Sequence, residues 1–210
     1  CGELDPAALQ MAQAYREALI CEVYREKVFA GEKAPLVLGT PQEWLASLIE
    51  AQRLLSLGQV QAAADLRARA FDAAPATSGD LDGTRFTWIA DADMRFGPVL
   101  EAVVNGRYFW LPFTQIASVA FDPPSDLRDA VWTAATIRLA NEGSVVALIP
   151  TRYPLTGQTG SPAEKLARAT SWSDVGAGTF VGLGQRILST DAGDTALLDA
   201  RLITFGEAVG

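Results

Sequence analysis

Two strand-like runs of mostly apolar residues flank Asn105-Gly106 within residues 86–113, FTWIADADMRFGPVLEAVVNGRYFWLPF. Asn-Gly is typical of a type I′ hairpin turn, because both central residues of that turn adopt positive φ. A two-residue turn at this position pairs Glu101 with Trp110 across the two strands. The pattern therefore predicts a β-hairpin, around which the rest of the chain is organised.

The two faces of this hairpin differ in character, because successive strand side chains point to opposite faces. The first face is apolar apart from Arg107 and is predicted to lie in the core; it carries Leu100, Ala102, Val104, Arg107, Phe109, Leu111 and Phe113. The second face is aromatic with one carboxylate; it carries Val99, Glu101, Val103, Tyr108, Trp110 and Pro112. This second face either packs under the N-terminal helices or forms a docking surface, since Tyr and Trp are enriched at binding hot spots. The candidate partner-binding residues are Trp88, Glu101, Val103, Tyr108 and Trp110.

Helical periodicity dominates the chain before this hairpin. Residues 5–30 are predicted to form one long helix that starts at Asp5-Pro6. Its apolar stripe is expected to contain Tyr15, Leu19, Ile20, Val23, Tyr24 and Val28. A second helix is predicted to start with a capping box over residues 40–43, and a third to span residues 59–74. These helices are either one degenerate tetratricopeptide-like hairpin or an ordinary antiparallel helix pair.

The loop at residues 76–83, ATSGDLDG, is predicted to separate two domains. Residues 1–78 form a helical, repeat-like domain in this interpretation, and residues 79–210 form a mainly antiparallel β domain. Further strands are expected in a hairpin around residues 140–143 and in two closing strands over residues 180–189 and 197–205. The predicted fold class is α+β.

Composition removes several classes of function. The chain carries a formal charge of −8 and shows no cluster of Lys and Arg, so we expect no nucleic-acid partner. It contains no histidine, which excludes Ser-His-Asp and Cys-His catalysis and histidine metal sites. No apolar run is as long as a membrane helix, so no membrane partner is expected. Cys21 is predicted to be a core thiol, and the missing disulfide framework fits a cytoplasmic protein.

Two groups of residues invite a chemical interpretation. Asp91, Asp93 and Glu101 are close enough in the chain to suggest a divalent metal and a carboxylate-based hydrolase. The structural alternative is that both aspartates cap a turn and pair with Arg95. The glycines near residue 180 do not follow the dinucleotide-binding spacing, because Val181 occupies the position of the required glycine. We therefore expect no cofactor.

Four stretches of the chain, taken together, resemble the TagJ family of type VI secretion accessory proteins, also called ImpE or SciE. They are LDPAALQMAQAYREA, the hairpin segment 86–113, VWTAATIRL and ALIPTRYP. The resemblance extends from about residue 4 to residue 205. The matching motif positions are Trp88, Asp91, Asp93, Arg95, Glu101, Asn105, Gly106, Arg107, Tyr108 and Trp110.

The resemblance implies a non-enzymatic adaptor. Proteins of this family are associated with the N-terminal helix of the small sheath subunit TssB. They are also associated with ClpV, the AAA+ ATPase that disassembles contracted sheath. Members usually carry a further helical hairpin before this point, so Cys1 is expected to mark a truncated chain and not a lipidated N-terminus. The alternatives are the carboxylate hydrolase and a structural scaffold that binds only itself.

Overall fold

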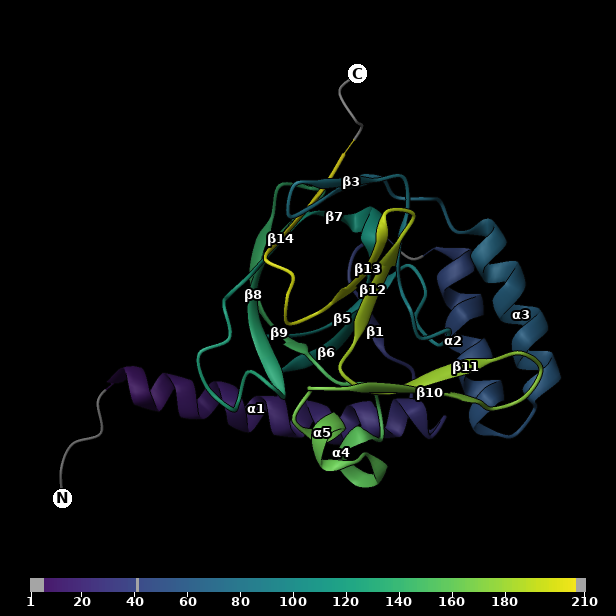
Figure 1. Cartoon of the computed structure of the whole chain (residues 1–210), viewed down its shortest axis with the longest axis horizontal. Coiled ribbons are helices and arrows are strands. Elements are labelled where there is room, and N and C mark those ends of the chain that lie inside the picture. Colours follow the sequence, from purple (N-terminus) through teal and green to yellow (C-terminus); the bar gives the residue numbers. More distant parts are fainter. Residues whose placement is uncertain (1–5, 41, 207–210) are drawn as a thin grey trace.

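The computed structural model describes residues 6–40 and 42–206 (Figure 1). Its long helices all come from the first part of the chain: α1 (Pro6–Phe29), α2 (Glu43–Ser56) and α3 (Val60–Ala73). Three short helical segments follow later: η1 (Phe113–Gln115), α4 (Thr156–Thr159) and α5 (Pro162–Lys165). Among residues 6–40 and 42–206, no helix is long and apolar enough to cross a membrane.

The strands form one large sheet and two small ones. In spatial order the nine-stranded sheet contains β1 (Leu36–Val37), β6 (Arg107–Pro112), β5 (Val99–Val104), β9 (Ser144–Pro150), β8 (Trp132–Leu139), β7 (Ile116–Phe121), β14 (Leu202–Phe205), β2 (Gly79–Leu81) and β3 (Thr84–Phe86). The three-stranded sheet contains β13 (Gly193–Ala196), β12 (Ile187–Thr190) and β4 (Ile89–Asp91), and the two-stranded sheet contains β10 (Thr170–Asp174) and β11 (Phe180–Gly184). Within residues 6–40 and 42–206, β1–β6 is the only parallel strand pair. The α+β class with a mainly antiparallel sheet is therefore confirmed.

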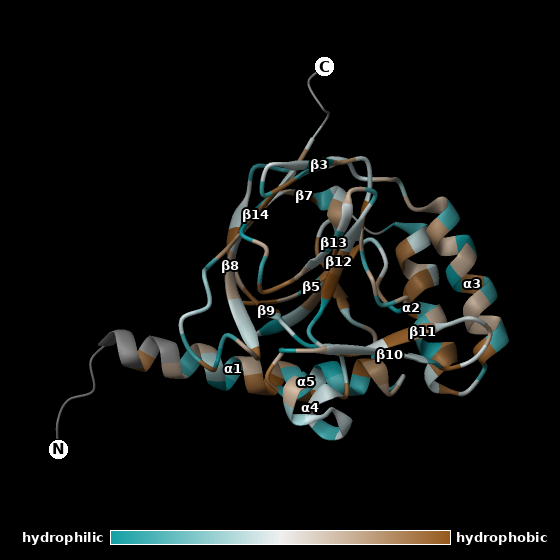
Figure 2. Cartoon of the chain, in the orientation of Figure 1, coloured by the Kyte–Doolittle hydropathy of each residue, from teal (hydrophilic) through white to brown (hydrophobic). Residues whose placement is uncertain are grey.

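The central hairpin has the predicted register. Glu101 pairs with Trp110, and Asn105 and Gly106 have φ of 48° and 68°. The first face is part of the main core, which contains Leu100, Ala102, Val104, Phe109, Leu111 and Phe113. Hydrophobic residues gather on strands in the middle of the molecule, among them β5 and β12 (Figure 2).

Helix α1 forms as predicted, but its buried stripe was only partly predicted: Val28 is buried and Tyr24 packs against the core, whereas three other expected members do not. The side chains of Ala18, Cys21, Arg25 and Val28 are buried, which confirms Cys21 as a core thiol. Leu19, Ile20 and Val23 face outward and are 59, 63 and 55% exposed. An ion pair explains this rotation, because buried Arg25 must face its carboxylate partner on β5. Asp5, the expected N-cap, lies outside the described residues.

Helices α2 and α3 are joined by residues 57–59 and pack side by side (Figure 1). The predicted capping box at residues 40–43 is wrong: α2 begins at Glu43, with Gln42 as N-cap and no side-chain capping bond. The side chain of Gln42 instead accepts a hydrogen bond from the indole of Trp44; Pro41 is outside the described residues. Repeat-like character, and a division at residue 78, stay predictions.

The expected strand over residues 180–189 is in fact two strands in different sheets, β11 and β12. Gly184, the last residue of β11, has φ of +97°, a conformation that glycine adopts without the steric cost of a side chain. The break turns Arg186 into the interior, where it is fully buried. The last strand is also shorter than predicted, since β14 begins only at Leu202.

Candidate functional site

Helices α1 and α2 cover the second face of the hairpin. Four predicted partner-binding residues are buried there, with exposed fractions of 0% for Glu101 and Trp110, 2% for Tyr108 and 6% for Val103. They pack with apolar residues of α1 and α2, among them Val28 and Leu48. The structure therefore shows the intramolecular packing alternative for these four, and a partner reaches them only if α1 moves. Trp88 lies elsewhere and is 41% exposed.

Glu101 is the centre of a buried ionic network. Its carboxylate accepts hydrogen bonds from Nε and Nη2 of Arg25, both at 2.7 Å, and from the hydroxyl of Tyr108. It also pairs with Nη1 of Arg186 at 3.0 Å. Burial opposes the charged form of Glu101, but the two guanidinium groups outweigh it and hold the pKa below its ordinary value. The network thus ties α1 to β5.

Asp91, the last residue of β4, and Asp93, two residues later, are also paired with arginines. Asp91 accepts from Nε of Arg186 at 2.8 Å and from the backbone N–H of Asp93 at 2.9 Å. Asp93 accepts from Nε of Arg95 at 2.9 Å and from the backbone N–H of Gly182 at 2.7 Å. Burial is the main cause that raises the pKa of Asp91 to about 6.

The predicted pairing with Arg95 is therefore right for Asp93 but wrong for Asp91, whose partner is Arg186. Among the described residues, no group of three or more His, Cys, Asp and Glu side chains is placed to hold a metal ion. Because each of the three carboxylates already accepts hydrogen bonds from an arginine, the geometry favours the structural interpretation over the metal site.

Sequence reasoning missed Arg25 and Arg186. Each is distant in sequence from its partner, Arg25 by 76 residues and Arg186 by 95. Neither belongs to a recognisable motif. The available signal was the position of Arg25 among apolar residues of a helix, which is typical of a buried and paired charge.

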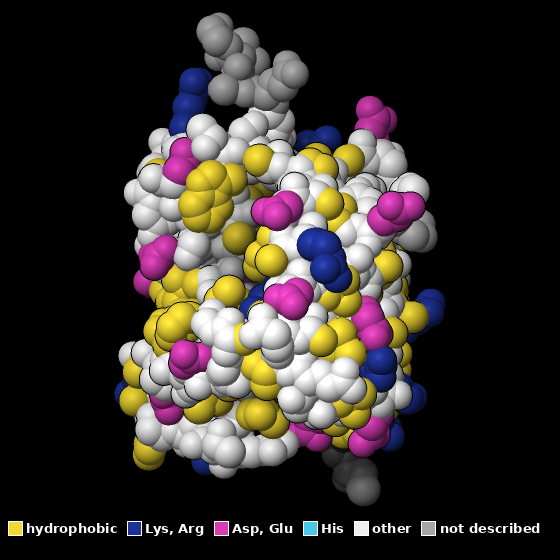
Figure 3. All heavy atoms as spheres, turned by 90° about the vertical axis from the view of Figure 1, so that its right-hand side faces the viewer, with side chains coloured by type: hydrophobic (Ala, Val, Ile, Leu, Met, Phe, Trp, Pro, Cys, Tyr) yellow, Lys and Arg dark blue, Asp and Glu magenta, His cyan; other side chains and the backbone are white. Residues whose placement is uncertain are grey.

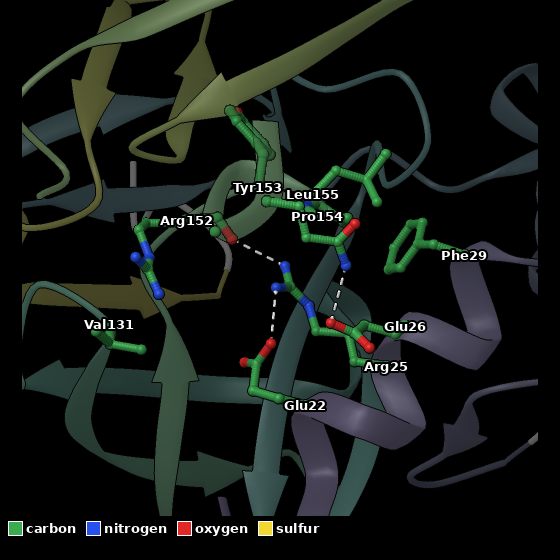
Figure 4. Close-up of a pocket in the computed structure, with 11 residues that line it drawn as sticks. Glu22, Arg25, Glu26, Phe29, Val131, Arg152, Tyr153, Pro154 and Leu155 are labelled. Atoms are coloured by element: carbon green, nitrogen blue, oxygen red, sulfur yellow. Dashed lines mark hydrogen bonds and ion pairs between the residues drawn. The ribbon is translucent and has the colours of Figure 1, made fainter. Parts of the chain in front are cut away.

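A small hollow of about 80 Å³ lies beside this network, between α1 and the segment that leads into α4 (Figure 4). Its polar groups bond to one another: Arg25 donates to the carbonyl of Arg152 at 2.9 Å, and Gln158 donates to Glu26 at 3.1 Å. These bonds, together with the small volume, make the hollow a poor candidate for a ligand site.

A larger and more apolar hollow, which we call the Trp88 groove, lies between the end of α3 and strand β4. Its volume is about 310 Å³, and its lining includes Phe71, Ala74, Pro75, Trp88, Ala92, Met94 and Pro98. The side carrying α2 and α3 shows hydrophobic side chains around a hollow, with acidic side chains nearby (Figure 3). Gly97 lets α3 approach, because a Cβ there would lie 2.3 Å from the ring of Phe71.

A turn of the three-stranded sheet holds the segment that carries Trp88. Asp191, in the turn between β12 and β13, accepts hydrogen bonds from the backbone N–H of Thr87 at 2.8 Å and from its hydroxyl at 2.7 Å. Trp88 follows directly in the chain. An aromatic side chain held at the edge of an apolar hollow is typical of a protein-binding surface.

Comparisons with known proteins agree on the family. The family model described as ImpE protein matches residues 83–204. The type VI secretion system accessory component TagJ of Pseudomonas aeruginosa is 50% identical over 204 residues, which cover 97% of this chain and 71% of that protein. A crystal structure of a Vibrio parahaemolyticus protein has a TM-score of 0.86 at 20% identity; the match covers 97% of this chain and 76% of that chain, and it shows the fold alone. The chain therefore belongs to the ImpE (TagJ) family of type VI secretion accessory proteins.

Proposed function

We propose that this protein is a non-enzymatic, cytoplasmic adaptor of the type VI secretion system. In this proposal it binds the N-terminal helix of the sheath subunit TssB and helps to recruit the ATPase ClpV to contracted sheath. The observation that carries the proposal is the 50% identity to an accessory component over 97% of the chain. The two named partners come from the family resemblance described above.

Three features of the molecule support a binding role over a catalytic one. The chain has no histidine, and its three clustered carboxylates Asp91, Asp93 and Glu101 are paired with buried arginines. An apolar groove with an exposed tryptophan is available for a partner. The C-terminal end of α3 forms one wall of this groove.

Sedimentation of contracted sheath tests both halves of the proposal. We expect this protein to pellet with sheath assembled from TssB and its partner subunit, and to raise the amount of ClpV in the same pellet. Sheath that lacks the TssB N-terminal helix serves as the control. A protein that stays in the supernatant with intact sheath contradicts the sheath half, and unchanged ClpV in the pellet contradicts the recruitment half.

A further inference from the structure

The Trp88 groove combines an apolar lining with a negative edge. No Lys or Arg is among the residues that line it in the described part of the chain. Its volume of about 310 Å³ is near the lower end of the roughly 300–1,000 Å³ that ligand pockets span. The groove therefore accommodates a few apolar side chains of a partner.

The C-terminal end of α3 supplies part of the negative potential. A helix carries about half a negative charge at its C-terminus, and a basic residue in the last turn often compensates it. The last turn of α3 holds no basic residue, and it contains the exposed side chain of Asp72. Phe71 and Ala74, at this end of the helix, line the groove.

A second exposed acidic side chain, Asp191, lies near Trp88. Asp191 is bonded to Thr87, next to Trp88, and these hydrogen bonds hold the pKa of its carboxyl below its ordinary value. Asp91 also lines the groove, but its carboxylate is buried and paired with Arg186, so it adds no free negative charge. Exposed acidic groups beside an apolar groove are complementary to an apolar segment with basic side chains at its margins.

We propose that the Trp88 groove binds an amphipathic helix whose apolar face is flanked by Lys or Arg. The apolar side chains contact Trp88, Met94 and Phe71, and the basic side chains face the end of α3 and Asp72. This inference rests on the proposed function, which makes a helix of another protein the partner. It adds the place of binding and the charge of the partner.

Three model peptides test the inference by calorimetry with the full chain. All three share one helical Leu face; the first carries Lys at the flanks, the second carries Glu, and the third is the Lys peptide with a central proline. We expect the Lys peptide to bind at least about tenfold more tightly than either of the others. If the Glu peptide binds as tightly as the Lys peptide, the partner need not be basic. If the proline peptide binds as tightly, the partner need not be helical, and either result contradicts the inference.

Matched variants locate the site. We expect Trp88→Ala to weaken binding of the Lys peptide at least about tenfold. Trp172→Ala removes a tryptophan of similar exposure, 42% against 41%, and is expected to leave the binding unchanged. We expect Asp72→Lys to weaken binding about threefold at low salt. Asp65→Lys is its control, because Asp65 lies two turns earlier on the same side of α3, about 10 Å away. Equal effects within either pair overturn the location.

The outcomes separate this inference from the proposed function. If a TssB peptide binds equally to the wild type and to Trp88→Ala, the adaptor role stands, but the groove is not the binding site. A TssB peptide that does not bind, while the Lys peptide binds at Trp88, overturns the named partner and supports the groove.

Discussion

At the scale of single residues, the buried network around Glu101 is the most consequential feature. Glu101 lies between Arg25 of α1 and Arg186, which follows β11, and none of the three side chains is more than 6% exposed. Removing one member of such a network leaves a charge without its partner in a low-dielectric interior. The network therefore fixes how α1 rests on the hairpin.

Neutralising Glu101 is expected to destabilise the fold strongly. Glu101→Gln leaves the guanidinium of Arg25 without its charged partner, which we expect to lower the free energy of unfolding by about 3–5 kcal/mol. Urea denaturation measures this loss. The control is Glu50→Gln, which breaks an exposed pair with Arg53 and is expected to leave the midpoint unchanged. A Glu101→Gln protein as stable as the wild type contradicts the network.

Asp91 is expected to give the fold a specific pH dependence. Its pKa is raised from 3.8 to about 6 by burial. The folded state therefore binds a proton more tightly than the unfolded state, and this part of the stability is lost as the pH rises from about 4 to about 6. At about 1.4 kcal/mol per pKa unit, the loss is about 3 kcal/mol.

Asp91→Asn isolates this contribution. The free energy of unfolding is measured for the wild type and for Asp91→Asn at pH 4 and at pH 7. We expect the difference, wild type minus variant, to be less favourable to the wild type at pH 7 than at pH 4. A difference that moves in the opposite direction means that the pairing with Arg186 outweighs burial and lowers the pKa of Asp91.

At the scale of elements, the sequence identifies α1 and the hairpin but not the way they meet. Strand register follows from Asn105-Gly106 and from side-chain alternation, both of which are local, and it is confirmed. The rotation of α1 depends on the Arg25–Glu101 pair, a contact over 76 residues that no local pattern contains. For this reason the apolar residues of α1 alone placed Leu19, Ile20 and Val23 in the stripe, although these three side chains are exposed.

Two neighbouring positions of α1 test its orientation. Ala18 is fully buried and Leu19 is 59% exposed. Ala18→Leu is expected to overpack the contact with the sheet and to lower stability by about 1–3 kcal/mol, whereas Leu19→Ala is expected to change it little. Thermal unfolding followed by circular dichroism measures both. A large loss of stability in Leu19→Ala and little change in Ala18→Leu would show that Leu19 is buried, as expected from the sequence.

The two tryptophans among the predicted partner-binding residues are expected to behave differently. Trp110 is completely buried, so Trp110→Ala is expected to lower the free energy of unfolding by about 3–5 kcal/mol. Trp88→Ala is expected to leave it nearly unchanged, since 41% of this residue is exposed. Urea denaturation of both variants distinguishes the cases. A stable Trp110→Ala protein shows that the hairpin face is not packed under α1 in solution.

At the scale of the whole molecule, the sequence gives the family and the α+β class, and the structure changes the location of the candidate site. The alternation in residues 99–113 identifies an amphipathic face, but it does not distinguish a surface for a partner from a surface for α1. Trp88 is part of both the sequence prediction and the groove. Phe71 and Pro98, on the groove's two sides, come together only through the packing of α3 against Gly97.

The most direct measurement is a calorimetric titration of a synthetic peptide, the N-terminal helix of TssB, into the wild type and into Trp88→Ala. The account predicts saturable, one-to-one binding to the wild type. It predicts binding at least about tenfold weaker, which is 1.4 kcal/mol, to a Trp88→Ala protein that melts at the same temperature. Absence of heat with the wild type at high peptide excess, together with an unchanged melting temperature, would contradict the adaptor function.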